Sequence, residues 1–285
     1  MKQFAGRVAA ITGAGSGIGR ALAVELATME CHVALSDVDD DALAETVALV
    51  EQAAPAAGSV KVSTAHVDVA DREAVEAWAA DVVAEFGHVN LIFNNAGVAL
   101  AANVPAMSYD NFRWLMDINF WGVVHGTLAF LPHLKASGDG HVVNISSVFG
   151  LLGIPSQSAY NAAKFAVRGF TDALRTELDI ERCGVSATTI HPGGIRTNIA
   201  RNARFEFADH EDAVDAEQAA VEFERLTRTT PEKAARLILG AVTKNKRRAL
   251  IGPDAHLFDA AARISPRASQ WALGRLIARN NPAIV

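Results

Sequence analysis

A glycine-rich loop near the start of the chain constrains the fold more than any other feature. The apolar run at residues 8–11 leads directly into Thr12-Gly13-Ala14-Gly15-Ser16-Gly17-Ile18-Gly19, and residues with helical spacing follow. Such a turn brings backbone N–H groups close to a pyrophosphate, whose charge lies at the positive end of the helix. The spacing uses Gly13, Gly17 and Gly19 rather than G-x-G-x-x-G, and no Lys-Ser or Lys-Thr follows as in a P-loop. The loop predicts dinucleotide binding, and a turn without a ligand is the alternative.

Short apolar runs alternate with longer amphipathic segments along most of the chain. This alternation predicts a parallel sheet with helices on both faces, and the near-continuous apolar character of the strands fits burial on both sides. We therefore expect a Rossmann-like, doubly wound α/β fold. The predicted strands are residues 8–11, 33–35, 60–67, 91–93, 142–145 and 185–190, and the predicted helices 20–27, 42–53, 72–86, 111–134 and 162–181.

The last third of the chain departs from this pattern. Residues 199–230 are charged and lack glycine, which predicts a mobile helical lid over about residues 198–230. Thr230 and Pro231 have the character of an N-cap and first helical residue, and residues 249–251 predict a last strand. We expect one catalytic domain over residues 1–252, including the lid, and an irregular C-terminal extension over residues 253–285.

Composition limits the partners and the location. The formal net charge of -6 over 285 residues argues against broad attraction to nucleic acid or to an anionic membrane surface. The N-terminus resembles neither a signal peptide nor a membrane span, so we expect a cytoplasmic protein with no transmembrane segment. Cys31 and Cys183 are too few for a disulfide framework, and we expect both to be buried thiols. The nine histidines lack metal-site spacing, so no metal is expected.

Asp37 follows the second predicted strand, 18 residues after Gly19. A carboxylate at about this distance accepts hydrogen bonds from the ribose hydroxyls and repels a 2′-phosphate. No Arg or Lys lies between Ser36 and Glu45 to receive such a phosphate, which favours NAD over NADP. The alternative is that Asp37 only opens an acidic run that caps the next helix.

A hydroxyl, a phenol and an ammonium group follow the strand at residues 142–145. Tyr160 and Lys164 are four residues apart and share one helix face, and Ser147 lies 13 residues earlier at the carboxyl edge of the sheet, where open α/β folds bind ligands. A ketone that becomes an alkoxide needs a proton donor, and an alcohol that loses hydride needs a base. We expect Lys164 to lower the pKa of Tyr160 from about 10 toward neutrality. Ser146 is the rival to Ser147, and only the spacing to Tyr160 favours Ser147.

Six ordered motifs together resemble the classical branch of the short-chain dehydrogenase/reductases, over about residues 5–252. The resemblance implies a seven-stranded parallel sheet and a homotetramer or homodimer. The motifs are the loop at residues 12–19, Asn94-Asn95-Ala96-Gly97, Asn119, Ser147, Tyr160-x-x-x-Lys164 and Pro192-Gly193.

The resemblance also implies a role for each site residue. Tyr160 is the acid/base and Lys164 its electrostatic partner, Ser147 orients the substrate, and Asn119 holds a water of the proton relay. For Asn119 the alternative is a buried amide that only satisfies backbone groups. The implied cofactor-binding residues are Gly13, Ser16, Gly17, Ile18, Gly19, Asp37, Asp68, Val69, Asn95, Ala96, Gly97, Tyr160, Lys164, Pro192, Gly193, Ile195 and Thr197.

These features predict an NAD-dependent alcohol dehydrogenase or ketone reductase. Phe205, Phe207 and Phe223 in the lid suggest a small apolar substrate, although they could equally pack the lid onto the body. A catalytically silent nucleotide-binding scaffold is the alternative, and a nucleotide-sugar epimerase would need a larger C-terminal domain than this chain has. The extension could pack on a neighbouring subunit, line the active site or, least favoured, lie on a membrane interface.

Overall fold

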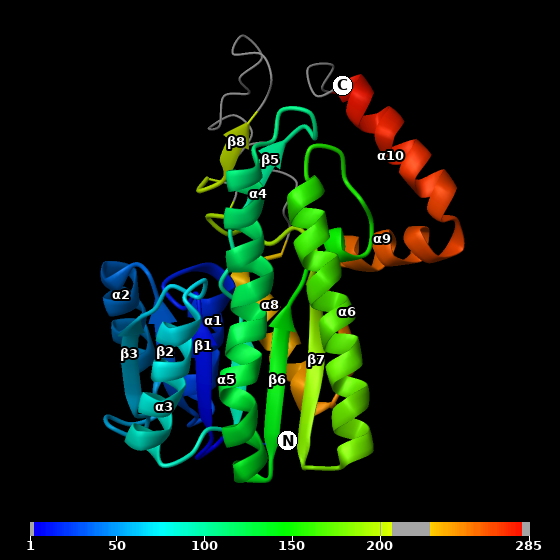
Figure 1. Ribbon diagram of the computed structural model, residues 1–285. Coiled ribbons are helices and arrows are strands. Elements are labelled where there is room, and N and C mark those ends of the chain that lie inside the picture. Colours follow the sequence, from blue (N-terminus) through cyan, green and yellow to red (C-terminus); the bar gives the residue numbers. More distant parts are fainter. Residues whose placement is uncertain (1–2, 200, 207–228, 281–285) are drawn as a thin grey trace.

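A parallel sheet of seven strands forms the centre of the computed structural model, which describes residues 3–199, 201–206 and 229–280 (Figure 1). The strand order is β3-β2-β1-β4-β6-β7-β9, which confirms the predicted Rossmann-like fold. The strands are β1 (Val8–Thr12), β2 (His32–Asp37), β3 (Val62–His66), β4 (Leu91–Asn94), β6 (Gly140–Ile145), β7 (Val185–Pro192) and β9 (Arg248–Ile251).

Each face of the sheet carries its own apolar core. Helices α1 (Gly17–Thr28), α2 (Asp40–Ala53) and α8 (Pro231–Thr243) pack on one face, with Leu26 and Ile238 fully buried there. The other face is covered by α3 (Arg72–Phe86), α5 (Gly122–Ser137) and α6 (Ser158–Glu181), where Phe130 is fully buried and Trp78 packs edge-on against it. Burial of each such side chain stabilises the fold by about 1.5–3 kcal/mol.

The direction in which the chain travels changes beside β1. The chain moves outward from β1 through β2 to β3 and then crosses back to β4, which pairs with the opposite side of β1. In open α/β sheets ligands bind at such a switch point, outside the carboxyl ends of the strands. The glycine-rich loop, which follows β1, and residues 95–97, which follow β4, both lie there.

The predicted helix at residues 111–134 contains an interruption. Helix α4 (Tyr109–Met116) passes into a π-helical turn, Asp117–Trp121, before α5 begins. A π-helical turn holds one extra residue per turn, and such turns are frequent at functional sites. The turn lies where Asn119 is buried.

Several predictions for the C-terminal third are corrected. Residues 204–206, expected to be helical, form strand β8 (Arg204–Glu206), which pairs with β5 (Leu100–Ala102). The extension is not irregular, because it folds into α9 (Pro253–Ile264) and α10 (Pro266–Asn280), which packs against α9 and extends beyond the body (Figure 1). Residues 207–228 of the lid, with Phe207 and Phe223, lie outside the described residues.

Two smaller expectations have different outcomes. Thr230 caps α8 by accepting a hydrogen bond from the Lys233 N–H, as predicted. Cys31 is buried, but Cys183 is partly exposed at the surface, which contradicts the expectation of two buried thiols. Within the part of the chain that the structure describes, no helix has both the length and the apolar character needed to cross a membrane.

Candidate active site

The glycine-rich loop joins β1 to α1 at the carboxyl end of the sheet. Gly13 and Gly17 have φ values of 63° and 53°, in the left-handed region that glycine tolerates best. A Cβ on Gly13 would lie 2.8 Å from the backbone of Ala96, so only glycine permits this close approach. The first turn of α1 has no acidic residue, and Ser16 makes no capping bond through its side chain. The positive end of α1 can therefore receive an anion.

Asp37 lies at the end of β2 and touches this loop. Its Oδ2 accepts a hydrogen bond from the Gly15 N–H at 2.8 Å, and its Oδ1 accepts one from the Val38 N–H at 2.8 Å. The cap of α2 is Asp39, whose side chain accepts from the Ala42 N–H. Asp37 is thus held against the glycine-rich loop, while its neighbour caps the helix.

Asn95 braces the end of β4 against the same loop. Its Nδ2 donates to the backbone oxygens of Thr12 (3.0 Å) and Gly13 (3.1 Å). The N–H groups of Asn95 and Ala96 donate to Oγ1 of Thr12, at 2.9 and 3.1 Å. These four bonds fix the two strand ends on either side of the switch point relative to each other.

Tyr160, Lys164 and Ser147 come together at the adjoining strand end. A hydrogen bond links the Tyr160 phenol to the Ser147 hydroxyl. The ammonium of Lys164 lies over the Tyr160 ring, 5.5 Å from its centroid, and donates to the backbone oxygen of Ile145 at 3.1 Å. A hydroxyl, a phenol and an ammonium group therefore converge, as predicted from their spacing.

The charge states in this cluster differ from the sequence expectation. Burial raises the pKa of Tyr160 to about 12, and the hydrogen bond from Ser147 opposes this rise. Burial also lowers the pKa of Lys164 to about 8, because it disfavours the ammonium form. The expected lowering of the Tyr160 pKa is thus wrong for the structure described. At neutral pH the cluster holds a protonated phenol beside a protonated amine.

The two neighbouring serines have separate tasks. Ser146 is almost fully buried, and its hydroxyl donates to the backbone oxygen of Lys164 at 2.8 Å. Ser147 is only half-buried, and its Oγ accepts from the Phe149 N–H at 3.1 Å. The backbone oxygen of Ser147 accepts a hydrogen bond from Nδ1 of His191 at 2.9 Å. Ser146 therefore anchors α6, and Ser147 faces the reactive cluster.

Asn119 connects the π-helical turn to the strand end after β4. Its Nδ2 donates to the backbone oxygen of Val98, and its Oδ1 accepts from the Val98 N–H, both at 2.8 Å. A Cβ on Gly97 would lie 3.2 Å from Oδ1 of Asn119 and 3.6 Å from Nζ of Lys164. Asn119 thus satisfies backbone groups, as the alternative interpretation predicted, and shares Gly97 as a neighbour with Lys164.

Comparisons with known proteins agree with this geometry. A family model described as short chain dehydrogenase matches residues 7–206. The putative oxidoreductase SadH of Mycobacterium tuberculosis is 52% identical over 266 residues, which cover 93% of this chain and 92% of that protein. This chain belongs to the short-chain dehydrogenase/reductase family. Family members are oxidoreductases that share this Rossmann-like fold.

Solved structures of other short-chain dehydrogenases have the same architecture. One from Burkholderia phymatum, in complex with NAD, has a TM-score of 0.82 at 30% identity and covers 95% of this chain and 97% of its own. Levodione reductase has a TM-score of 0.78 at 30% identity, over 90% of this chain and 100% of its own. The levodione reductase sequence from Leifsonia aquatica is 37% identical over 223 residues, 78% of this chain and 80% of that protein.

The other expected cofactor residues of this short-chain dehydrogenase lie along the same edge of the sheet. Asp68 is exposed, whereas Val69 is buried with its side chain against Gly122. The segment after β7 passes close to the glycine-rich loop, because a Cβ on Gly17 would lie 3.0 Å from Cγ2 of Thr197. Ile195 of this segment is buried in the core.

Sequence reasoning missed two charged residues of this short-chain dehydrogenase. Arg20 braces the glycine-rich loop by donating to the Gly15 oxygen at 2.5 Å and pairing with Glu45 at 2.9 Å. Asp254 of α9 accepts a hydrogen bond from the Gly194 N–H at 2.6 Å. A detectable signal for Asp254 was the sequence Gly252-Pro253-Asp254 after a strand, which is typical of a helix start.

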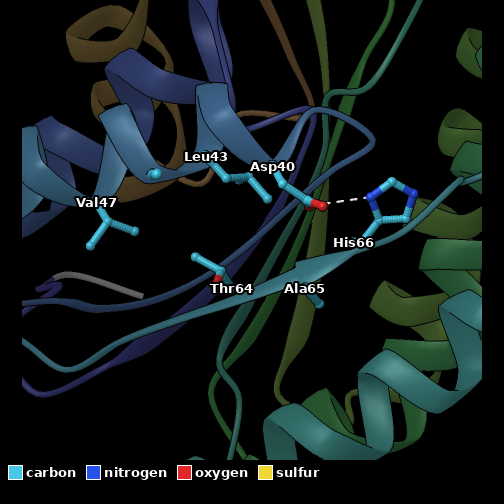
Figure 2. Close-up of a pocket in the computed structure, with 7 residues that line it drawn as sticks. Asp40, Leu43, Val47, Thr64, Ala65 and His66 are labelled. Carbon is cyan, nitrogen blue, oxygen red and sulfur yellow. Dashed lines mark hydrogen bonds and ion pairs between the residues drawn. The ribbon is translucent and has the colours of Figure 1, made fainter.

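A separate hollow of about 400 Å³ lies between α2 and the edge strand β3 (Figure 2). Leu43 and Val47 form part of its lining, and Nδ1 of His66 lies 3.2 Å from Oδ1 of Asp40. Both side chains are largely exposed, so their contact contributes little to stability. The hollow contains none of the convergent hydroxyl, phenol and ammonium groups, and we assign the chemistry to the strand ends instead.

Proposed function

We propose that this chain is an NAD-dependent alcohol dehydrogenase or ketone reductase. It transfers a hydride between NAD(H) and the CH–OH or C=O carbon of a small apolar substrate. The observation that carries the proposal is the convergence of Ser147, Tyr160 and Lys164 at the carboxyl end of β6. This strand is next to β4, whose end is hydrogen-bonded to the glycine-rich loop. When bound, NAD supplies the ring carbon that accepts or donates the hydride.

The residues at the switch point fit this cofactor. The N-terminus of α1 offers backbone donors and a positive dipole to the pyrophosphate, and the bare glycines permit its close approach. Asp37 offers carboxylate acceptors to the ribose hydroxyls. The nearby cation, Arg20, is already engaged by Glu45 and by backbone oxygens, which supports NAD over NADP. Solved relatives from Burkholderia phymatum and Mycobacterium paratuberculosis contain NAD.

Proton transfer is the task of Tyr160. With a pKa raised to about 12, the phenol is protonated at neutral pH and can give its proton to the oxygen of a ketone as the carbonyl is reduced. In the oxidative direction the phenolate form of Tyr160 accepts the proton of the alcohol, so the phenol must first lose its own proton. Ser147 orients the substrate oxygen, and the Lys164 ammonium favours the phenolate when the proton has left. Asn119 is the proposed holder of a proton-relay water.

The surroundings of Tyr160 support an apolar substrate. The Phe149 ring packs edge-on against Tyr160, with centroids 5.8 Å apart. Tyr160 also packs against the apolar cluster that includes Leu100, Leu115 and Ala159. A small polar substrate would leave its hydrogen-bonding groups unsatisfied in such surroundings.

We also infer a cytoplasmic homodimer or homotetramer. Trp121 and Leu128 beside and within α5 and Phe165 of α6 are exposed apolar side chains, and apolar surface of this kind is typical of subunit interfaces. Both cysteines are free thiols, which fits a reducing compartment.

The first test replaces the phenol. Tyr160→Phe should abolish turnover of a panel of aliphatic, aromatic and steroidal alcohols and ketones, measured by NADH absorbance, and leave NADH binding nearly unchanged. The matched control is Tyr109→Phe, because Tyr109 is 85% exposed at the start of α4 and outside the cluster. Retained activity in Tyr160→Phe would remove this residue from its role. NADH binding by a wild type that turns over no substrate would favour the scaffold alternative.

A further inference from the structure

The segment that follows β7 connects the two halves of the proposed site. At its start, Nδ1 of His191 donates to the backbone oxygen of Ser147, beside the reactive cluster. At its end, the methyl group of Thr197 lies against Gly17, at the positive end of α1. Residues 192–197 therefore extend from the cluster of Ser147, Tyr160 and Lys164 to the N-terminus of α1, which would receive the pyrophosphate. The part of a dinucleotide that spans this distance is its nicotinamide half.

Asp254 holds the middle of this segment. Its Oδ2 accepts the Gly194 N–H at 2.6 Å, and it fills the space beside Gly193, where an added Cβ would overlap the carboxylate. The Gly193 N–H donates to the backbone oxygen of Ile251 at 2.9 Å, directly before α9. The backbone of Gly193 is thus bonded to the end of β9, and that of Gly194 to the first turn of α9.

The charge of Asp254 is suited to this position. Asp254 is the acidic residue in the first turn of α9, where the helix dipole stabilises a carboxylate. Its neighbour on the helix, Asp259, is used differently, because it pairs with Arg248 at 2.6 Å and Arg263 at 3.1 Å. Asp259 thereby attaches α9 to β9 without touching residues 193 and 194. Asp259 therefore anchors the helix, and Asp254 supports the segment that follows β7.

We propose that Asp254 is a positioning residue for the nicotinamide half of the cofactor. Its carboxylate fixes the Gly193–Gly194 backbone so that residues 192–197 keep the shape that receives the nicotinamide ring. This proposal rests on the proposed NAD-dependent function and extends it to α9, which becomes part of the wall of the active site. Asp37, at the end of β2, and Gly15, after β1, would receive the adenosine half and are joined to each other by a hydrogen bond, whereas Asp254 supports the segment after β7.

Two ligands separate this role from a general structural one. NADH contains the nicotinamide ring, and ADP-ribose contains the same adenosine, phosphates and second ribose without that ring. Asp254→Ala should raise the Kd of NADH roughly ten-fold, measured by fluorescence, since a hydrogen bond to a charged group is lost. The Kd of ADP-ribose, measured by calorimetry, should change by less than about two-fold. Asp254→Asn keeps an oxygen that can accept the Gly194 N–H, and should restore part of the NADH affinity.

Asp259→Asn is the matched control on the same helix. It should lower the melting temperature by weakening the attachment to Arg248, and leave the ratio of the two Kd values unchanged. If Asp254→Ala weakens the affinity for NADH and for ADP-ribose equally, or weakens neither, the positioning role is overturned while the NAD-dependent function stands. A wild-type protein that binds neither ligand would instead overturn the proposed function, and this inference with it.

Discussion

The side-chain amide of Asn119 pairs with both backbone groups of Val98, with each hydrogen bond 2.8 Å long. Val98 follows β4 at the switch point, and Asn119 lies in the π-helical turn Asp117–Trp121. Gly97, which precedes Val98, has both Asn119 and Lys164 as neighbours. The two bonds therefore hold the π-helical turn against the segment that follows β4.

Asn119→Leu should destabilise the protein and reduce its activity. Leucine has a similar size but leaves both backbone groups of Val98 without their partner, at a cost of about 2–4 kcal/mol in the free energy of unfolding. Urea denaturation measures this change. The control is Asp117→Asn on the same turn, whose side chain is exposed and whose effect should stay within about 0.5 kcal/mol. An unchanged midpoint for Asn119→Leu would show that the two bonds contribute little.

Ser146 and Ser147 should respond in opposite ways to replacement by alanine. Ser147→Ala removes the hydroxyl that is hydrogen-bonded to Tyr160, so turnover should fall by roughly 10²- to 10⁴-fold. Its melting temperature should fall only slightly, through loss of the bond from the Phe149 N–H. Ser146→Ala removes a buried bond to the Lys164 oxygen and should lower the free energy of unfolding by about 1 kcal/mol with a smaller effect on turnover. Steady-state kinetics and thermal denaturation of both variants test this pair. The reverse pattern would make Ser146 the substrate-orienting residue.

The rate of ketone reduction should depend on pH through Lys164. Its pKa is lowered to about 8, so the ammonium is present below that pH and is lost as the pH rises through it. Tyr160, with its pKa raised to about 12, keeps its proton over the same interval. We therefore expect kcat/KM for reduction to be level below about pH 8 and to fall above it. NADH affinity measured over the same range is the control, and a level profile up to about pH 10 would contradict this assignment.

The local patterns of the chain were sufficient to predict most of its body. Buried parallel strands are short apolar runs, and the apolar residues of amphipathic helices recur every three to four positions. The runs at residues 8–11 and 72–86 therefore located β1, which extends to Thr12, and α3. The convergence of Tyr160 with Ser147 followed from strand order and helical spacing. These features depend on short-range geometry, which the sequence determines directly.

The features that were missed depend on contacts between distant segments. Strand β8 has three residues and exists through its pairing with β5, about a hundred positions earlier. The π-helical turn leaves the apolar periodicity of its segment almost unchanged, and only the polar Asn119 among apolar neighbours hinted at it. The raised pKa of Tyr160 reflects burial, which spacing alone does not reveal.

Asp37→Ala should change the preference between the two dinucleotides. The carboxylate accepts the Gly15 N–H, so its loss loosens the glycine-rich loop and weakens both NADH and NADPH. NADH should suffer more, because it also loses the acceptor for its ribose hydroxyls, whereas NADPH is relieved of repulsion at its 2′-phosphate. The measurement is therefore the ratio of the two Kd values, which should change in favour of NADPH by roughly ten-fold.

Asp39→Ala is the matched control, since it removes the cap of α2, at a cost of about 1 kcal/mol in the free energy of unfolding, without touching Gly15. An unchanged ratio in Asp37→Ala would contradict the ribose-binding role, because loosening of the loop alone weakens both dinucleotides equally.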